Sequence, residues 1–182
     1  MIPTPAATSP RCCITCAETV MRHCFYSFHY QADNWRAAKI RSIGAIHGER
    51  EAYDNGWEAV KNGSEQAIEN WINTEMNGCS CAIVLIGEQT AGRKWIDYEI
   101  KQAWEKGLGL LGIYIHGITD RNGQTAKAGI NPFAKFNVGN VALSNIVRAY
   151  DPTGYDSATR YADISQNLGK WVEEAIAIRN RY

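Results

Sequence analysis

Two uninterrupted apolar segments limit the folds open to this chain more than any other feature. Residues 80–86 (SCAIVLI) and 109–115 (GLLGIYI) contain no charged side chain. A strand that is apolar along its whole length is typical of a parallel sheet whose two faces are both covered by helices. Between these segments, residues 94–106 carry apolar side chains at helical spacing. The order strand, helix, strand therefore predicts an α/β fold with a parallel sheet.

The alternation of strands and helices continues in both directions along the chain. Further strands are predicted at residues 23–28, 145–150 and, more weakly, 45–46. Further helices are predicted at residues 35–41, 64–72 and 164–178. Asp33 or Asn34 is expected to cap the first of these helices, and Ser64 the second. Ligands of such sheets bind outside the carboxyl ends of the strands, so a site is expected in the residues that follow each strand.

The composition fits one domain and gives no sign of a highly charged partner. The chain has 182 residues, with 19 basic and 19 acidic side chains and no formal net charge. It contains no basic run typical of nucleic-acid binding, and no apolar stretch approaches the roughly 18 residues of a membrane helix. We therefore expect no nucleic-acid or membrane partner. Since no secretory signal is recognisable, the expected location is the cytoplasm, where the six cysteines would be thiols.

The N-terminal segment differs in composition from the rest of the chain. Its first ten residues hold three of the five prolines, which predicts a disordered leader over residues 1–20 and a folded domain over 21–182. The three cysteines of the leader (CCITC) lack a second ligand pair at zinc-binding spacing, so no metal site is expected. Met21 stands just before the first predicted strand and is a candidate for the natural start.

One carboxylate of the predicted helix 94–106 has an unusual position. Ile96, Ile100 and Ala103 form the apolar arc of that helix, and Glu99 falls on its shoulder. A carboxylate at the edge of a buried arc is partly desolvated and can still face a cleft, which suits a catalytic group. A solvated surface glutamate fits the same spacing, so periodicity alone leaves both interpretations open.

Several segments, taken together, resemble a known family. They are Phe25–Tyr30 (FYSFHY), Trp57, Ala82–Gly87 (AIVLIG), Arg93–Glu99 (RKWIDYE), Leu111–His116 (LGIYIH) and Asn131–Phe133 (NPF). In this order, across roughly residues 23–178, they are similar to the bacterial TIR-like family of Thoeris antiphage systems. The resemblance implies a flavodoxin-like TIR fold, in which a mostly parallel five-stranded sheet has helices on both faces. It also implies that Glu99 corresponds to the catalytic glutamate of the family.

The same resemblance implies a substrate, products and partners. The substrate would be NAD, and no separate cofactor or metal would be needed. The products would be ADP-ribose or its cyclised or conjugated forms, which act as antiviral signals by activating a separate effector protein. Self-association through TIR surfaces is a further implied contact.

A single carboxylate is sufficient for cleavage of NAD. Ordinary glycosidases need two carboxylates, because one of them must protonate a poor leaving group. The nicotinamide of NAD leaves as a neutral molecule, so the main requirement is a negative charge beside the developing ribosyl cation. Glu99 is therefore the predicted catalytic residue.

The residues predicted to bind the substrate are Ser27, Phe28, Tyr30, Trp57 and Trp95. The rings of Phe28 and Tyr30 follow the first strand, where nicotinamide or adenine can stack, and Trp57 can close over the ligand. Each residue also has a purely structural interpretation. Ser27 can satisfy the end of the strand, the aromatic rings can belong to the core, and Trp95 can hold Glu99 in place.

Two other functions fit the same residues. One is a TIR-like interaction module without catalysis, and the other is depletion of NAD without a dedicated signal. The chain has no Walker motif, which argues against magnesium-dependent nucleotide hydrolysis.

Overall fold

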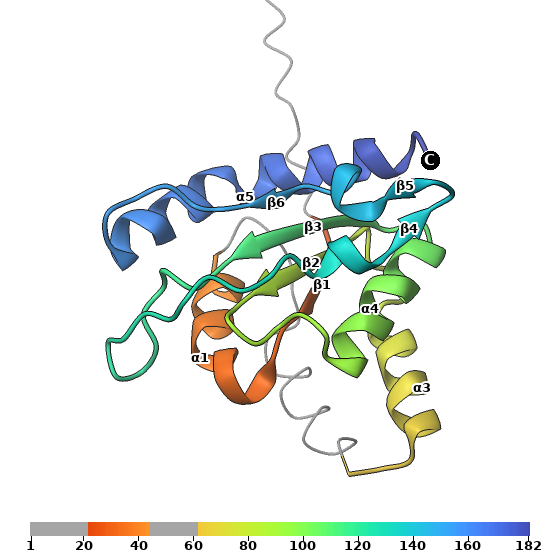
Figure 1. Cartoon of the computed structure of the whole chain (residues 1–182), viewed down its shortest axis with the longest axis horizontal. Helices are drawn as coiled ribbons and strands as arrows, with labels where there is room; N and C mark the ends of the chain where they lie inside the picture. The colour runs from red at the N-terminus through yellow and green to blue at the C-terminus, as the bar shows by residue number, and fades with distance from the viewer. Residues whose placement is uncertain (1–21, 44–61) are drawn as a thin grey trace, which may run out of the picture.

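The computed structural model describes residues 22–43 and 62–182 and shows an α/β fold (Figure 1). Four of its strands form one parallel sheet in the order β1-β2-β3-β6, and two others form a short antiparallel hairpin. The strands of the sheet are β1 (Cys24–Ser27), β2 (Cys81–Ile86), β3 (Gly109–Tyr114) and β6 (Ala149–Tyr150). The strands of the hairpin are β4 (Asn137–Val138) and β5 (Val141–Ala142). The predicted α/β class with a parallel sheet is confirmed for these residues.

The centre of the sheet is also the centre of the hydrophobic core. β2 lies between β1 and β3, with Cys81 opposite Cys24 on one side and Ile86 opposite Tyr114 on the other. All residues of β2 are buried, as expected for a strand covered on both faces. The continuous apolar run that predicted this strand is thus explained by its central position.

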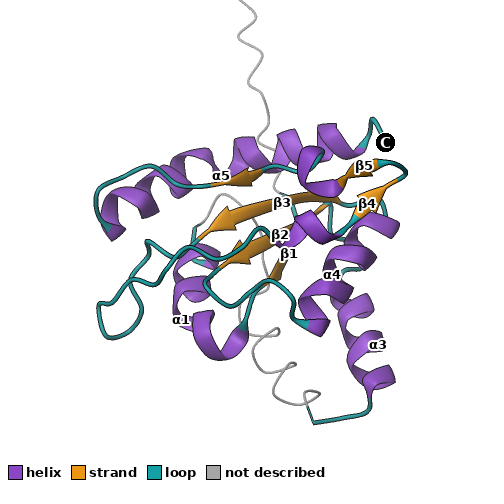
Figure 2. Cartoon of the chain, viewed as in Figure 1, coloured by secondary structure: helices purple, strands orange, loops and turns teal. Residues whose placement is uncertain are grey.

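Two glycines of β3 show how the faces of the sheet are covered. A Cβ atom on Gly109 would stand 2.7 Å from the backbone nitrogen of Ile176, whereas a Cβ atom on Gly112 would stand 2.9 Å from the ring of Phe133. Residues 109 and 112 point to opposite faces, so Ile176 and Phe133 cover opposite faces. Helices therefore flank the sheet on both sides (Figure 2). The described helices are α1 (Tyr30–Arg41), α3 (Glu65–Glu75), α4 (Lys94–Glu105) and α5 (Ser157–Arg179).

The start of α1 differs from the prediction, whereas the start of α3 agrees with it. A cap at Asp33 or Asn34 is wrong, because α1 already begins at Tyr30. The carboxylate of Asp33 is buried and accepts a hydrogen bond from the guanidinium of Arg36 at 3.1 Å. It therefore pairs with an arginine of its own helix and does not cap the helix start. Ser64 caps α3 as predicted, since its hydroxyl accepts a hydrogen bond from the backbone N–H three residues later.

The C-terminal part of the chain contains less strand and more helix than predicted. The last strand is limited to Ala149–Tyr150, and a 3₁₀ turn at Leu143–Asn145 precedes it. α5 begins at Ser157, earlier than predicted, because Asp156 and Thr159 form a capping box that satisfies free backbone N–H groups at the helix start.

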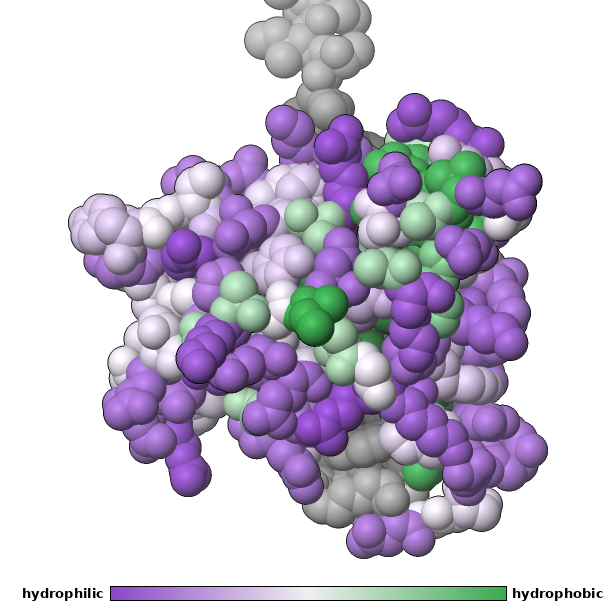
Figure 3. All heavy atoms as spheres, viewed as in Figure 1, coloured by the Kyte–Doolittle hydropathy of each residue, from purple (hydrophilic) through white to green (hydrophobic). Residues whose placement is uncertain are grey.

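The surface of the described part of the chain is mixed in character. Hydrophilic residues cover most of the face in Figure 3, and hydrophobic residues form small separate areas on it. Among the described residues, no helix combines the length and the apolar character needed to span a membrane. The weak strand predicted at residues 45–46, the substrate contact predicted at Trp57 and the leader predicted over residues 1–20 lie outside the described residues.

Candidate functional site

The candidate site lies where β1 and β2 end. Ser27 is the last residue of β1, and the segment 87–93 leads from β2 to the start of α4. Because β1 and β2 are parallel neighbours, their carboxyl ends lie at the same edge of the sheet. This is the edge at which open α/β sheets bind their ligands.

Glu99 is a buried residue of α4. Its side chain is only 3% exposed, and it shares the inner face of the helix with Ile96, Ile100 and Ala103. These four residues follow the spacing i, i+3, i+4, i+7, so they lie in one stripe along the helix. Glu99 was predicted at the edge of this stripe, whereas in the structure it lies inside the stripe.

The carboxylate of Glu99 is bound by the end of β1. The hydroxyl of Ser27 donates a hydrogen bond to Oε2 of Glu99 over an oxygen–oxygen distance of 2.5 Å. Ser27 is itself only 1% exposed, and the two residues are 72 positions apart in the chain. Hydrogen bonds from a hydroxyl to an ionised carboxylate are short, typically about 2.5–2.7 Å. The distance between Ser27 and Glu99 therefore lies in the range typical of an ionised carboxylate.

The two aromatic residues after Ser27 lie close to each other. The ring centroids of Phe28 and Tyr30 are 6.3 Å apart, with Phe28 buried and Tyr30 half-buried. The guanidinium of Arg41 lies 5.2 Å from the centroid of the Phe28 ring, in a cation–π contact. Tyr26, one of the aromatic residues of β1, is buried in the core.

Trp95 lies on the first turn of α4 and is supported by its neighbours. Its ring packs edge-on against Tyr98 at a centroid distance of 6.1 Å, and the ammonium of Lys94 lies 4.9 Å from its ring centroid. The hydroxyl of Tyr98 accepts a hydrogen bond of 2.9 Å from the side-chain amide of Asn73, a residue of α3. α3 thus fixes the turn of α4 that carries Trp95 and leads to Glu99.

The buried pair of Arg36 and Asp33 holds the loop after β3 (residues 115–131), which packs on the end of β2. Arg36 donates hydrogen bonds to the carbonyl oxygens of Ile118 and Gln124 at 2.8 and 3.0 Å, and to the carboxylate of Asp33. Burial raises the pKa of Asp33, and the nearby charge of Arg36 counteracts part of that effect. The spacing Asp-x-x-Arg on one helix was a signal for this pair, although it does not reveal that the pair is buried.

The same loop approaches β2 so closely that glycine is required. A Cβ atom on Gly129 would stand 2.0 Å from the carbonyl oxygen of Gly87, the first residue after β2. Because the obstructing atom is a backbone carbonyl oxygen, no side-chain movement can make room for a Cβ atom at residue 129. The loop after β3 is therefore packed directly on the edge of the sheet where the candidate site lies.

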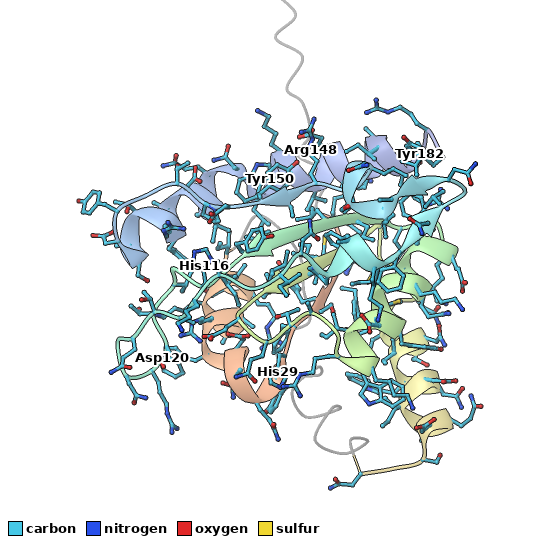
Figure 4. The ribbon with its side chains drawn as sticks, viewed as in Figure 1. His29, His116, Asp120, Arg148, Tyr150 and Tyr182 are labelled. Carbon is cyan, nitrogen blue, oxygen red and sulfur yellow. The ribbon has the colours of Figure 1, made fainter. Side chains whose placement is uncertain are left out.

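His29 lies directly after Phe28 and was not predicted as a site residue. Its Nδ1 atom is buried and has no hydrogen-bond partner among the described residues. Burial lowers the pKa of His29, and the positive charge of Arg93 lowers it further. Both effects favour a neutral imidazole at this end of the sheet, and Figure 4 shows His29 between α1 and the start of α4.

A separate cavity lies at the other edge of the sheet. It has a volume of about 590 Å³ and follows β6 and the end of α5; Arg148, Tyr150, Glu174 and Arg181 are among its lining residues (Figure 4). Since β1 and β6 are the two outer strands, this cavity is distant from the pair of Ser27 and Glu99. It is not part of the candidate site.

The structure thus brings together some of the predicted site residues. Ser27 and Glu99 are in direct contact, Phe28 and Tyr30 follow Ser27 along the chain, and Trp95 lies one helical turn before Glu99. The contact between Ser27 and Glu99 carried no signal in the sequence, because a pair separated by 72 positions has no spacing rule.

Comparison with known proteins gives two matches. Residues 25–120 match a family model described as "Thoeris protein ThsB, TIR-like domain". The chain is also 37% identical, over 114 residues, to a protein of Bacillus cereus (strain MSX-D12) named "Putative cyclic ADP-D-ribose synthase ThsB1". This similarity covers 60% of the present chain and 59% of the length of that relative. The family model includes the end of β1 and all of α4, and therefore both Ser27 and Glu99.

Proposed function

Because the chain belongs to the Thoeris ThsB TIR-like domain family, we propose that it cleaves the bond between nicotinamide and ribose in NAD and forms a cyclic ADP-ribose signal. The observation that carries the proposal is the buried carboxylate of Glu99, held by Ser27 at the end of the sheet where ligands bind. The name of the Bacillus cereus relative supports the cyclic product.

Glu99 would act by stabilising the charge that develops on the ribose. When the bond from the ribose C1′ to the nicotinamide nitrogen breaks, its electron pair goes to that nitrogen and neutralises the pyridinium. No general acid is needed, and the ribose becomes an oxocarbenium-like cation. A fixed negative charge in a water-poor site stabilises such a cation far better than the same charge in water.

The identity of the product depends on what captures the cation. An adenine nitrogen of the same molecule would give cyclic ADP-ribose, and water would give ADP-ribose; either capture releases one proton. A site closed to water favours the internal route. The loop packed on Gly87 and the burial of Glu99 are consistent with restricted access of water.

The bases of NAD would be held by the aromatic residues of the site. Phe28 and Tyr30 follow the end of β1, and Trp95 stands one helical turn before Glu99, so all three belong to the segments that meet at this end of the sheet. Ring stacking suits nicotinamide and adenine, which are both flat and aromatic. Trp57 belongs to the same proposal as a residue that closes over the ligand.

The wider role follows from the family. We propose a cytoplasmic enzyme of antiphage defence, whose product activates a separate effector protein and whose TIR surfaces allow self-association. The complete domain would have the flavodoxin-like TIR form with five strands, to which the four parallel strands described above contribute.

The test is to identify the product of the purified protein. Wild-type protein and Glu99→Gln are incubated with NAD, with and without phage lysate as a trigger, and nicotinamide and nucleotides are measured by chromatography and mass spectrometry. We expect release of nicotinamide together with a nucleotide one water lighter than ADP-ribose, from the wild type alone. Release of ADP-ribose as the sole nucleotide would indicate depletion of NAD. No release under either condition would indicate a non-catalytic module.

A further inference from the structure

The contact between Ser27 and Glu99 has a consequence for the role of the serine. A serine hydroxyl carries one proton and can donate one hydrogen bond. At 2.5 Å from Oε2 of Glu99, the hydroxyl of Ser27 donates that one hydrogen bond to the carboxylate. The hydroxyl proton is therefore engaged with Glu99 and is not available for a phosphate or hydroxyl oxygen of the substrate.

We propose that Ser27 is a positioning residue, which fixes the orientation and the charged state of Glu99 rather than binding the substrate. This inference rests on the proposed function, because it assigns a role relative to the catalytic carboxylate. It replaces the substrate contact predicted for Ser27 from the sequence.

The first part of this role is geometric. A glutamate side chain has three rotatable bonds, and Glu99 projects from the middle of α4 toward the sheet. Ser27 is the last residue of the buried strand β1, so its hydroxyl is fixed by the core of the protein. A hydrogen bond from this rigid donor selects one orientation of the carboxylate before the substrate arrives, and such preorganisation is the basis of electrostatic catalysis.

The second part of the role concerns charge. Burial of a carboxylate disfavours its ionised form, and a hydrogen bond donated to the ionised form favours it. Glu99 is almost fully buried, so the hydroxyl of Ser27 offsets part of the cost of keeping a negative charge at this position. The proposed reaction needs that negative charge, because it stabilises a cation.

The experiment compares Ser27→Ala with Ser27→Thr and with the control Ser144→Ala, a residue of the distant cavity along β6. We expect Ser27→Ala to lower kcat by roughly 10- to 100-fold with KM nearly unchanged, and Ser27→Thr, which keeps a hydroxyl, to recover most of the loss. The acidic limb of the pH profile of kcat/KM should move upward by roughly one to two pH units in Ser27→Ala, since the carboxylate has lost a donor.

Other outcomes would overturn the inference. A raised KM with an unchanged kcat would assign Ser27 to substrate binding, and unchanged kinetics and pH profile would show that the hydrogen bond has no role in the reaction. If Ser27→Ala does not fold, as judged by circular dichroism, Ser27→Cys takes its place, because a thiol is a weaker donor in the same position. The proposed function fails separately, namely if Glu99→Gln retains wild-type activity.

Discussion

Replacement of Arg36 by methionine tests whether the buried charged pair holds the edge of the sheet together. Methionine keeps much of the aliphatic volume of the side chain and removes the guanidinium. The substitution removes the hydrogen bonds from the guanidinium to the carbonyl oxygens of Ile118 and Gln124, at 2.8 and 3.0 Å, and its contact with the carboxylate of Asp33 at 3.1 Å. Asp33, which is 2% exposed, would then be left in the interior without a counter-charge.

The expected loss of stability follows from the burial of both partners. Their side chains are 6% and 2% exposed, so the pair belongs to the buried class. Removing one partner of a buried pair costs about 3–5 kcal/mol, because an uncompensated charge remains. For a chain of this length, about 2–4 °C of Tm correspond to 1 kcal/mol, so we expect Tm to fall by roughly 6–20 °C.

The pH dependence gives this prediction a second readout. Burial raises the pKa of Asp33 and Arg36 lowers it, so removal of Arg36 raises the pKa further above the unfolded value of 3.8. An acid with a raised pKa in the folded state contributes stability below its unfolded pKa and loses that contribution as the pH rises through its folded pKa. The difference in stability between wild type and Arg36→Met should therefore be large at pH 7 and smaller near pH 4.

The assay is thermal and urea unfolding followed by circular dichroism at several pH values. Arg121→Met, an exposed arginine of the same loop, is the control and should shift the free energy of unfolding by less than about 0.5 kcal/mol. The double variant Arg36→Met, Asp33→Asn should recover part of the loss at pH 7, because no buried charge remains. A loss below about 1 kcal/mol in Arg36→Met, or no recovery in the double variant, would refute this reasoning.

Two further predictions concern the parts of the fold around the sheet. Phe133 is completely buried against β3, so Phe133→Ala should lower the free energy of unfolding in urea by about 3–5 kcal/mol; a change below 1 kcal/mol would show that the ring does not belong to the core. Asp156 accepts a hydrogen bond from the backbone N–H of Thr159 at 2.8 Å, so Asp156→Ala should cost about 0.5–2 kcal/mol in thermal unfolding. An unchanged Tm of Asp156→Ala would exclude a stabilising cap at the start of α5.

The elements that the sequence predicted well are those whose residues act locally. The apolar runs at 80–86 and 109–115 became β2 and β3, because a central strand of a covered sheet must be apolar at every position. Ser64 caps α3 since a serine before an amphipathic segment has a strong local preference for this place.

The elements that were predicted poorly depend on contacts that are distant in the chain. Asp33 looks like a helix cap in sequence, and only the burial of Arg36 beside it explains its other role. Apolar residues such as Ile146 and Val147 suggested a longer last strand, but they are buried without strand pairing. Periodicity alone was insufficient in both cases, because tertiary packing decided the outcome.

The candidate site also combines a feature that the sequence predicted with features that depend on contacts distant in the chain. Glu99 was predicted as a site residue from the resemblance of its segment to the family, and its place beside the carboxyl end of β1 agrees with the general rule for open sheets. Its full burial and its hydrogen bond from Ser27 were not predictable, because they depend on how α4 packs on a strand far away in the sequence.

The most direct test of the central claim compares two glutamates of α4. Glu99→Gln removes the charge and preserves the size of the buried side chain, which can still accept the hydrogen bond of Ser27. Glu105→Gln makes the same change at an exposed position of the same helix. In a triggered reaction with NAD, we expect nicotinamide release to fall by roughly 10²- to 10³-fold or more in Glu99→Gln and to remain at the wild-type rate in Glu105→Gln. Release at the wild-type rate by folded Glu99→Gln would contradict the claim that this carboxylate drives cleavage.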